Sequence, residues 1–136
     1  MKKKFVILLS VVAVFAGCAT VPSEDGVDSK AAVAKMASAR WQALIQGNLD
    51  EAYTFISPAS KDVLPLERYK AGIKPGIWKR VEVSEVTCSA EDVCEARVVV
   101  FYHPNLKGLP VGALASREVT ETWRQASGKW WFVPDR

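Results

Sequence analysis

The spacing of apolar residues changes once along this chain of 136 residues, and this change limits the fold more than any other feature. From about residue 29, apolar residues recur every three or four positions, which predicts helices at about 29–46, 49–55, 58 onward and 65–72. Beyond Ile77 the period becomes two, which predicts strands at about 78–88, 94–103, 117–125 and 129–133. Helices followed by neighbouring strands indicate an α+β domain in which N-terminal helices pack on an antiparallel sheet.

Residues 1–17 have the pattern of a secretory signal peptide. Three lysines at 2–4 precede an apolar or small run at 5–17, which is shorter than the ~20 residues that cross a membrane. The run ends in Phe-Ala-Gly before Cys18, which resembles the lipobox of bacterial lipoproteins, although that family usually has Leu where this chain has Phe. The resemblance implies cleavage before Cys18 and lipid on its thiol. The alternative is an ordinary secretory signal with a chance cysteine.

The lipobox resemblance also implies a location. Ala19 follows the cysteine, and lipoproteins without Asp at that position usually go to the outer membrane. We therefore expect the chain to be anchored there, facing the periplasm, if the host is Gram-negative, and otherwise to lie at the extracellular face of the cell membrane. Residues 18–29 are predicted to form a polar tether, followed by a single domain at 30–136.

The charge balance excludes nucleic acid as a partner. The chain has 18 basic and 15 acidic residues, but three of the lysines belong to the predicted signal, which leaves 15 of each. No basic tract with interleaved aromatic residues is present, and export argues further against nucleic acid. The sequence also lacks a Gly-rich phosphate loop and a metal-binding cluster, so we expect no cofactor and no metal.

The two remaining cysteines, Cys88 and Cys94, flank a predicted hairpin loop at 89–93 and are expected to form a disulfide in an oxidising compartment. Metal binding is the alternative, but the chain has one histidine. If the two cysteines face each other, antiparallel pairing predicts five further pairs: Glu85 with Arg97, Val86 with Ala96, Ser84 with Val98, Val83 with Val99, and Val81 with Phe101.

Two segments resemble the NTF2-like superfamily, whose cone-shaped fold is shared by nuclear transport factor 2, scytalone dehydratase and ketosteroid isomerase. The first is Gly-Asn-Leu-Asp-Glu-Ala-Tyr at 47–53, continued at 56–59, and the second is Glu-Thr-Trp at 121–123 with the Trp-rich hairpin at 128–134. The resemblance covers residues 30–134 and implies a curved sheet that wraps against helices around an apolar cavity. Members use that cavity for catalysis, for ligand binding or as a scaffold, so the fold alone does not settle function.

Glu121 is the strongest candidate for an acid or a base. The period of two places it between Val119 and Trp123 on one strand face, where desolvation would raise the pKa of its carboxyl. An isomerase or hydro-lyase would use such a group. The alternative, which we prefer, is an ion pair with Arg80 or Arg97, or a place near the sheet margin.

The other candidates are His103 and four aromatic residues. His103 is the only histidine and ends a predicted strand, where it would act as a general base near the cavity mouth or, as we prefer, be a partly exposed strand end. Four aromatic residues are candidate walls of a ligand cavity, although aromatic residues also fill small cores: Trp41, Tyr53, Trp123 and Trp131. Because Trp130 and Trp131 are adjacent and must face opposite sides of a strand, one of them is a candidate for a partner or homodimer surface.

Together these features favour a membrane-anchored lipoprotein whose domain binds a small apolar ligand or an envelope partner without catalysing a reaction. One alternative is an envelope isomerase or hydro-lyase that uses Glu121, with or without His103. Another is a structural or assembly lipoprotein without a ligand. The sequence leaves open the ligand, the partner, the oligomeric state and the strand order.

Overall fold

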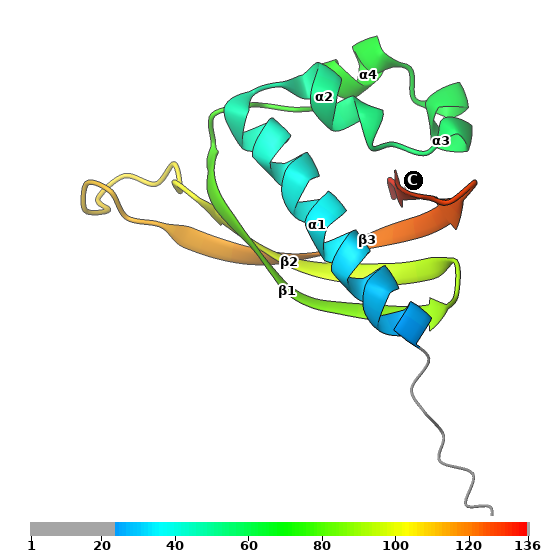
Figure 1. Cartoon of the computed structure of the whole chain (residues 1–136). Helices are drawn as coiled ribbons and strands as arrows, with labels where there is room; N and C mark the ends of the chain where they lie inside the picture. The colour runs from blue at the N-terminus through cyan, green and yellow to red at the C-terminus, as the bar shows by residue number, and fades with distance from the viewer. Residues whose placement is uncertain (1–23, 136) are drawn as a thin grey trace, which may run out of the picture.

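The computed structural model describes residues 24–135, which form helices followed by strands (Figure 1). The helices are α1 (Glu24–Gln46), α2 (Leu49–Thr54), α3 (Pro58–Val63) and α4 (Leu66–Ala71). The strands are β1 (Trp78–Ala90), β2 (Val93–Tyr102), β3 (Ala115–Ala126) and β4 (Lys129–Val133), and they form one antiparallel sheet in the order β1-β2-β3-β4. The expected α+β arrangement, with N-terminal helices on a curved antiparallel sheet, is confirmed.

The predicted signal peptide, Cys18 and the first part of the predicted tether lie outside the described residues. Helix α1 begins at Glu24 rather than near residue 29, so residues 24–29 of the predicted tether are helical. The sequence there, Glu-Asp-Gly-Val-Asp, is acidic, and acidic residues favour the N-terminal end of a helix. Among the described residues, no helix is both long and apolar enough to cross a membrane.

Local signals in the sequence determine where the first helices begin and end. Gly47 ends α1 with a φ of 76°, in the left-handed region that glycine adopts without strain. Asn48 caps α2 by accepting a hydrogen bond from the backbone N–H of Glu51 at 3.3 Å. Ser57 caps α3 in the same way, by accepting from the N–H of Ser60 at 3.2 Å. These turns place the three short helices together at one end of the molecule (Figure 1).

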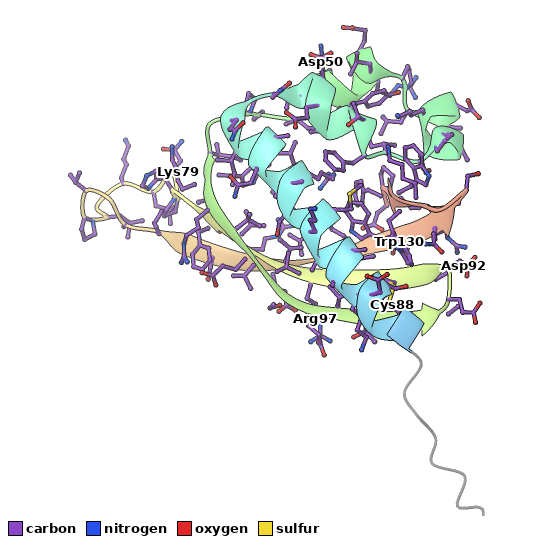
Figure 2. The ribbon with its side chains drawn as sticks, viewed as in Figure 1. Asp50, Lys79, Cys88, Asp92, Arg97 and Trp130 are labelled. Atoms are coloured by element: carbon purple, nitrogen blue, oxygen red, sulfur yellow. A yellow bond between two sulfur atoms is a disulfide. The ribbon has the colours of Figure 1, made fainter. Side chains whose placement is uncertain are left out.

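The first hairpin of the sheet carries the predicted disulfide. Cys88 and Cys94 are bonded to each other, and their Cα atoms are 3.9 Å apart. Cys94 is fully buried in the core, and Cys88 lies beside the N-terminal half of α1 (Figure 2). Next to the disulfide the register is as predicted: Glu85 faces Arg97, and Val86 faces Ala96.

A bulge in β1 changes the pairing farther along the hairpin. Ser84 is the extra residue: its hydroxyl donates to the carbonyl of Arg97 at 3.2 Å, but no residue of β2 lies opposite it in the register, so Val83 faces Val98 and Val81 faces Val100. Three predicted pairs are therefore wrong: Val83 with Val99, Val81 with Phe101, and Ser84 with Val98. Side chains alternate between the two faces of a strand, so the extra residue turns Val81 and Val83 to the inner face, against buried valines of β2. The bulge thus brings two more valines to the core.

The core lies between α1 and the inner face of the sheet. Val33, Ala37 and Leu44 face the sheet from α1 at helical spacing and are buried. The main chain of Phe132 in β4 closes the other side of the core, because its N–H donates to the carbonyl of Phe55 at 2.8 Å and its carbonyl accepts from the N–H of Ser57 at 2.9 Å. The segment between α2 and α3 is thereby fixed to the edge of the sheet.

The outer face of the sheet is charged. Arg97 on β2 forms ion pairs with Glu85 at 2.9 Å and with Glu118 at 3.8 Å, and it points away from α1 (Figure 2). Arg80 pairs with Glu82 on β1. All five side chains are more than half exposed. The outer face is therefore a solvated surface.

Candidate functional site

Helix α1 and the inner face of the sheet enclose a cavity of about 460 Å³. Its walls are mostly apolar and come from α1, from all four strands and from the residue before β1: Trp41, Ile77, Trp78, Val100, Val119 and Phe132. Its polar side chains include Arg40, Glu121 and Tyr102, with Arg117 and Asp135 in exposed positions. A mostly apolar cavity of this size, with a few polar groups, is typical of a small-molecule site.

The carboxylate of Glu121 lies in the wall of this cavity, is only 2% exposed, and is bound by three N–H groups. Its Oε1 accepts a hydrogen bond from Nη1 of Arg40 at 2.6 Å and another from Nε1 of Trp41 at 2.7 Å. Its Oε2 accepts from Nε1 of Trp123 at 3.2 Å. Both carboxylate oxygens are therefore engaged, and the guanidinium charge balances the carboxylate charge.

Burial raises the pKa of the Glu121 carboxyl, because an ionised carboxylate loses its hydration in this position. The positive charge of Arg40 and the indole N–H groups of Trp41 and Trp123 oppose this rise. When Glu121 is ionised, its oxygens are occupied by these donors. When it is protonated, it cannot take a proton from a substrate. The geometry therefore suits a group that holds its neighbours in place better than it suits a general base.

Arg40 connects the polar cluster to the cavity. It is only 7% exposed, and its guanidinium lies over the ring of Phe132 at 3.8 Å. Within residues 24–135, Nη1 is the guanidinium nitrogen with a hydrogen-bond partner, and the buried Nε has none. The buried hydroxyl of Tyr69 is also without a partner there, and burial raises the pKa of this phenol. The cluster thus has one buried N–H without an acceptor, while three N–H groups already bind the two carboxylate oxygens of Glu121.

The expected partners of Glu121 are wrong. Arg97 pairs with glutamates on the outer face, and Arg80 pairs within its own strand. Glu121 does not lie near the sheet margin either, because β3 is an inner strand of the sheet and its Glu121 side chain is buried. Its partner is Arg40 of α1. The physical reason is that a carboxylate buried on the inner face needs a charge from the layer that covers it, and that layer is α1.

The remaining candidate residues lie at several different places. Trp41 lines the cavity, whereas Trp123 is fully buried behind Glu121 and packs on Phe132 at 5.8 Å between ring centroids. His103 is exposed, and its Nδ1 lies 3.0 Å from the carbonyl oxygen of Ala113, within the loop between β2 and β3. His103 and Glu121 are therefore not assembled as a pair.

Tyr53 and Trp131 lie outside this cavity. Tyr53 donates a hydrogen bond to the carbonyl of Leu64 at 2.9 Å and packs against Tyr69, which joins α2 to α4. Trp131 lines a second hollow of about 720 Å³ beside α3, between Lys61 at 5.7 Å and Lys129 at 4.3 Å from its ring centroid. The adjacent Trp130 is buried, so the two tryptophans face opposite sides of β4 as predicted.

Most residues that line the cavity were missed by the analysis of the sequence, among them Arg40, Trp78 and Tyr102. The burial of Arg40 could have been predicted, because positions 33, 37, 40 and 44 follow the helical spacing of the buried face of α1. Trp78 and Tyr102 were harder to predict, because they lie at the ends of two strands that become neighbours only when the first hairpin pairs. No group of three or more His, Cys, Asp or Glu side chains in the described part of the chain is placed to hold a metal ion.

The sequence matches no family model, nor any curated protein, but solved structures share its fold. A SEC-C motif-containing protein of Psychrobacter arcticus has a TM-score of 0.60 at 14% identity, over 95% of this chain and 75% of that one. A SEC-C motif-containing protein of Rhodopseudomonas palustris has a TM-score of 0.55 at 14% identity, over 73% of each chain. A Campylobacter jejuni protein assigned as an NTF2-like transpeptidase has a TM-score of 0.54 at 12% identity, over 74% of this chain and 96% of that one.

This chain has an NTF2-like fold. The expected cone of helices on a curved sheet is thereby confirmed. Identities of 12–14% establish the architecture of the NTF2-like domain and nothing about its chemistry. The function has to be argued from the cavity.

Proposed function

We propose that the chain is an exported lipoprotein, anchored by lipid on Cys18, whose NTF2-like domain binds a small and mostly apolar ligand without converting it. The observation that carries the binding role is the cavity of about 460 Å³ between α1 and the sheet, with apolar walls and one polar cluster. The anchor rests on the signal-like residues 1–17 and on the lipobox-like motif that ends at Cys18.

The polar cluster restricts the chemistry of the ligand. Both carboxylate oxygens of Glu121 accept hydrogen bonds from N–H groups, whereas the buried Nε of Arg40 has no acceptor among residues 24–135. When Glu121 is ionised, Arg40 and Glu121 together carry no net charge. A neutral ligand that brings one acceptor oxygen to Arg40 and lays its apolar body along Trp41 and Trp78 satisfies this site.

A catalytic role for Glu121 has less support. An acid or base needs a lone pair or a proton directed at the substrate, whereas Glu121 is 2% exposed and three of the four lone-pair positions of its carboxylate are directed at Arg40, Trp41 and Trp123. A purely structural lipoprotein has less support as well, because the outer face of the sheet is charged rather than apolar.

The binding role is tested by native mass spectrometry of the full chain, purified without harsh detergent. We expect a co-purified small molecule, and we expect Val119→Trp, which fills the cavity, to remove it. Val99→Trp is the matched control, because Val99 lies on the outer face of β2, and it should keep the adduct. The neutral dye N-phenylnaphthylamine should bind to the control variant and not to Val119→Trp. Empty protein with no dye binding at this cavity would exclude the proposed function.

The anchor is tested by Cys18→Ser in a bacterial host. We expect the wild-type chain to fractionate with membranes and to carry the added mass of a lipid, and the variant to lose both. In a Gram-negative host the wild-type chain should be in the outer membrane, because Ala19 follows the cysteine. A variant that stays with membranes and is processed to the same mass would exclude lipidation.

A further inference from the structure

The loop between β2 and β3, residues 103–114, is an arm that projects from the sheet (Figure 1). It carries four large apolar side chains that face solvent: Leu106, Leu109, Val111 and Leu114. A fifth, Ile77, lies beside it, because its carbonyl accepts a hydrogen bond from the N–H of His103 at 3.3 Å. The described part of the chain has six exposed large apolar residues, so all but Val63 are at the arm. Such clustering is not expected of a surface that meets only water.

The charges of the arm are of one sign. Residues 103–117 include Lys107 and Arg117 and no Asp or Glu. Lys79 is exposed next to Trp78, which pairs with Tyr102 at the base of the arm (Figure 2). Apolar side chains flanked by lysine and arginine, without acidic residues, are the combination that binds an anionic lipid surface.

The base of the arm forms the end of the cavity at which the exposed lining residues Ile77 and Arg117 lie, which we call the mouth of the cavity. Tyr102 and Arg117 line the cavity and lie on the strands that lead into and out of the arm. Ile77 belongs to both features, since it lines the cavity and is exposed beside His103. A surface that covers the arm therefore also meets the entrance to the ligand site.

We infer that the arm inserts its apolar side chains into an anionic membrane and turns the mouth of the cavity toward the bilayer, from which the ligand enters. This inference deepens the proposed function and rests on it for the ligand route alone; insertion of the arm does not depend on what the cavity holds. A membrane is favoured over a protein partner because the cavity at the base of the arm is itself apolar, and apolar small molecules concentrate in bilayers.

The arm and the proposed anchor can reach one membrane. In Figure 1 the arm projects on the side opposite the start of α1. Cys18 is six positions before Glu24, and an extended chain spans ~3.5 Å per residue, so the anchor can be at most about 21 Å from the start of α1. This reach is enough for the domain to lie with the long axis of the sheet along the membrane.

The test is the depth of a nitroxide label in membranes. The full chain with Val111→Cys, its disulfide intact, is labelled and reconstituted in vesicles of phosphatidylethanolamine and phosphatidylglycerol. We expect the label to be accessible to oxygen and protected from a water-soluble nickel complex. A label at Asp50→Cys, an exposed position on α2 far from the arm, should remain accessible to nickel (Figure 2).

Two second-site variants sharpen the result. Adding Leu109→Asp should abolish the lipid signature at position 111, whereas Val63→Asp, at the one exposed apolar residue away from the arm, should leave it unchanged. A label that is as exposed to nickel as the control overturns the inference. A label that is protected from both oxygen and nickel also overturns it, and assigns the arm to a protein contact or a second copy of the chain. If the label inserts but the cavity is always empty, membrane insertion by the arm is confirmed and only ligand binding by the cavity is rejected.

Discussion

At the scale of single residues, the contact between Arg40 and Glu121 determines what the cavity can do. The two side chains come from α1 and β3, are 81 positions apart, and meet at 2.6 Å in a buried position. A buried ion pair contributes little net stability, because desolvation offsets attraction, but removing one partner leaves an unbalanced charge in an apolar environment. The pair therefore keeps the cluster together because separating the two side chains would leave an unbalanced charge in an apolar environment.

Arg40→Met tests this argument at one position. The variant keeps an apolar side chain of similar length but leaves the Glu121 carboxyl without a cation, and we expect a loss of about 3 kcal/mol in the free energy of unfolding at pH 7. Loss of the positive charge raises the pKa of Glu121 further, so the destabilisation should grow as pH rises. The double variant with Glu121→Gln should recover much of the loss. Urea unfolding measures all three chains, and a loss that is independent of pH would argue against the pairing.

At the scale of elements, the bulge at Ser84 determines which side of β1 is buried. On either side of the bulge, side chains alternate regularly between the inner and outer faces of the sheet. The extra residue shifts this alternation by one position. Without the bulge, Val81 and Val83 would share the outer face with Arg97. The charged outer face and the apolar inner face of the hairpin thus both depend on one unpaired residue.

Deleting Ser84 should turn the two valines out of the core. Fully burying a valine contributes roughly 1.5 kcal/mol or more, so we expect a loss of about 3 kcal/mol in the free energy of unfolding. Ser84→Ala is the matched control: it keeps the bulge at an exposed position and should change stability by less than ~0.5 kcal/mol. Chemical denaturation compares the two, and equal stabilities would mean that the bulge does not set the core.

At the scale of the whole molecule, stability depends on pH through the buried cluster. Burial raises the pKa of Glu121 above the ordinary glutamate value of 4.5, so the folded state binds this proton more tightly than the unfolded state does. The resulting contribution to stability is fully present below about pH 4.5 and is lost as pH rises through the raised pKa. Glu121→Gln has no proton to exchange at this position.

We therefore expect the wild-type chain to lose stability relative to Glu121→Gln as pH rises above 4.5. The measurement is the free energy of unfolding of both chains across the acidic and neutral range. The difference isolates Glu121, because every other titrating group is common to the two chains. A difference that moves the opposite way would mean that attraction to Arg40 outweighs burial, and that the pKa is lowered.

Short-range patterns predicted most of the architecture. The change from helices to strands, the disulfide between Cys88 and Cys94, and the burial of Glu121 between apolar neighbours all follow from spacing within a few residues. The anchor at Cys18 stays a prediction, because it lies outside the described residues.

The sequence by itself determined the order of helices and strands and the alternation of side chains on regular stretches of strand, because both depend on the local period of side chains. Only the tertiary structure decided that Arg40 meets Glu121, that Ser84 shifts the register, and that Trp41 and Trp78 share a cavity while Trp131 lies elsewhere. These outcomes depend on how α1 is laid across the sheet, and that placement is set by packing and charge balance between residues far apart in the chain.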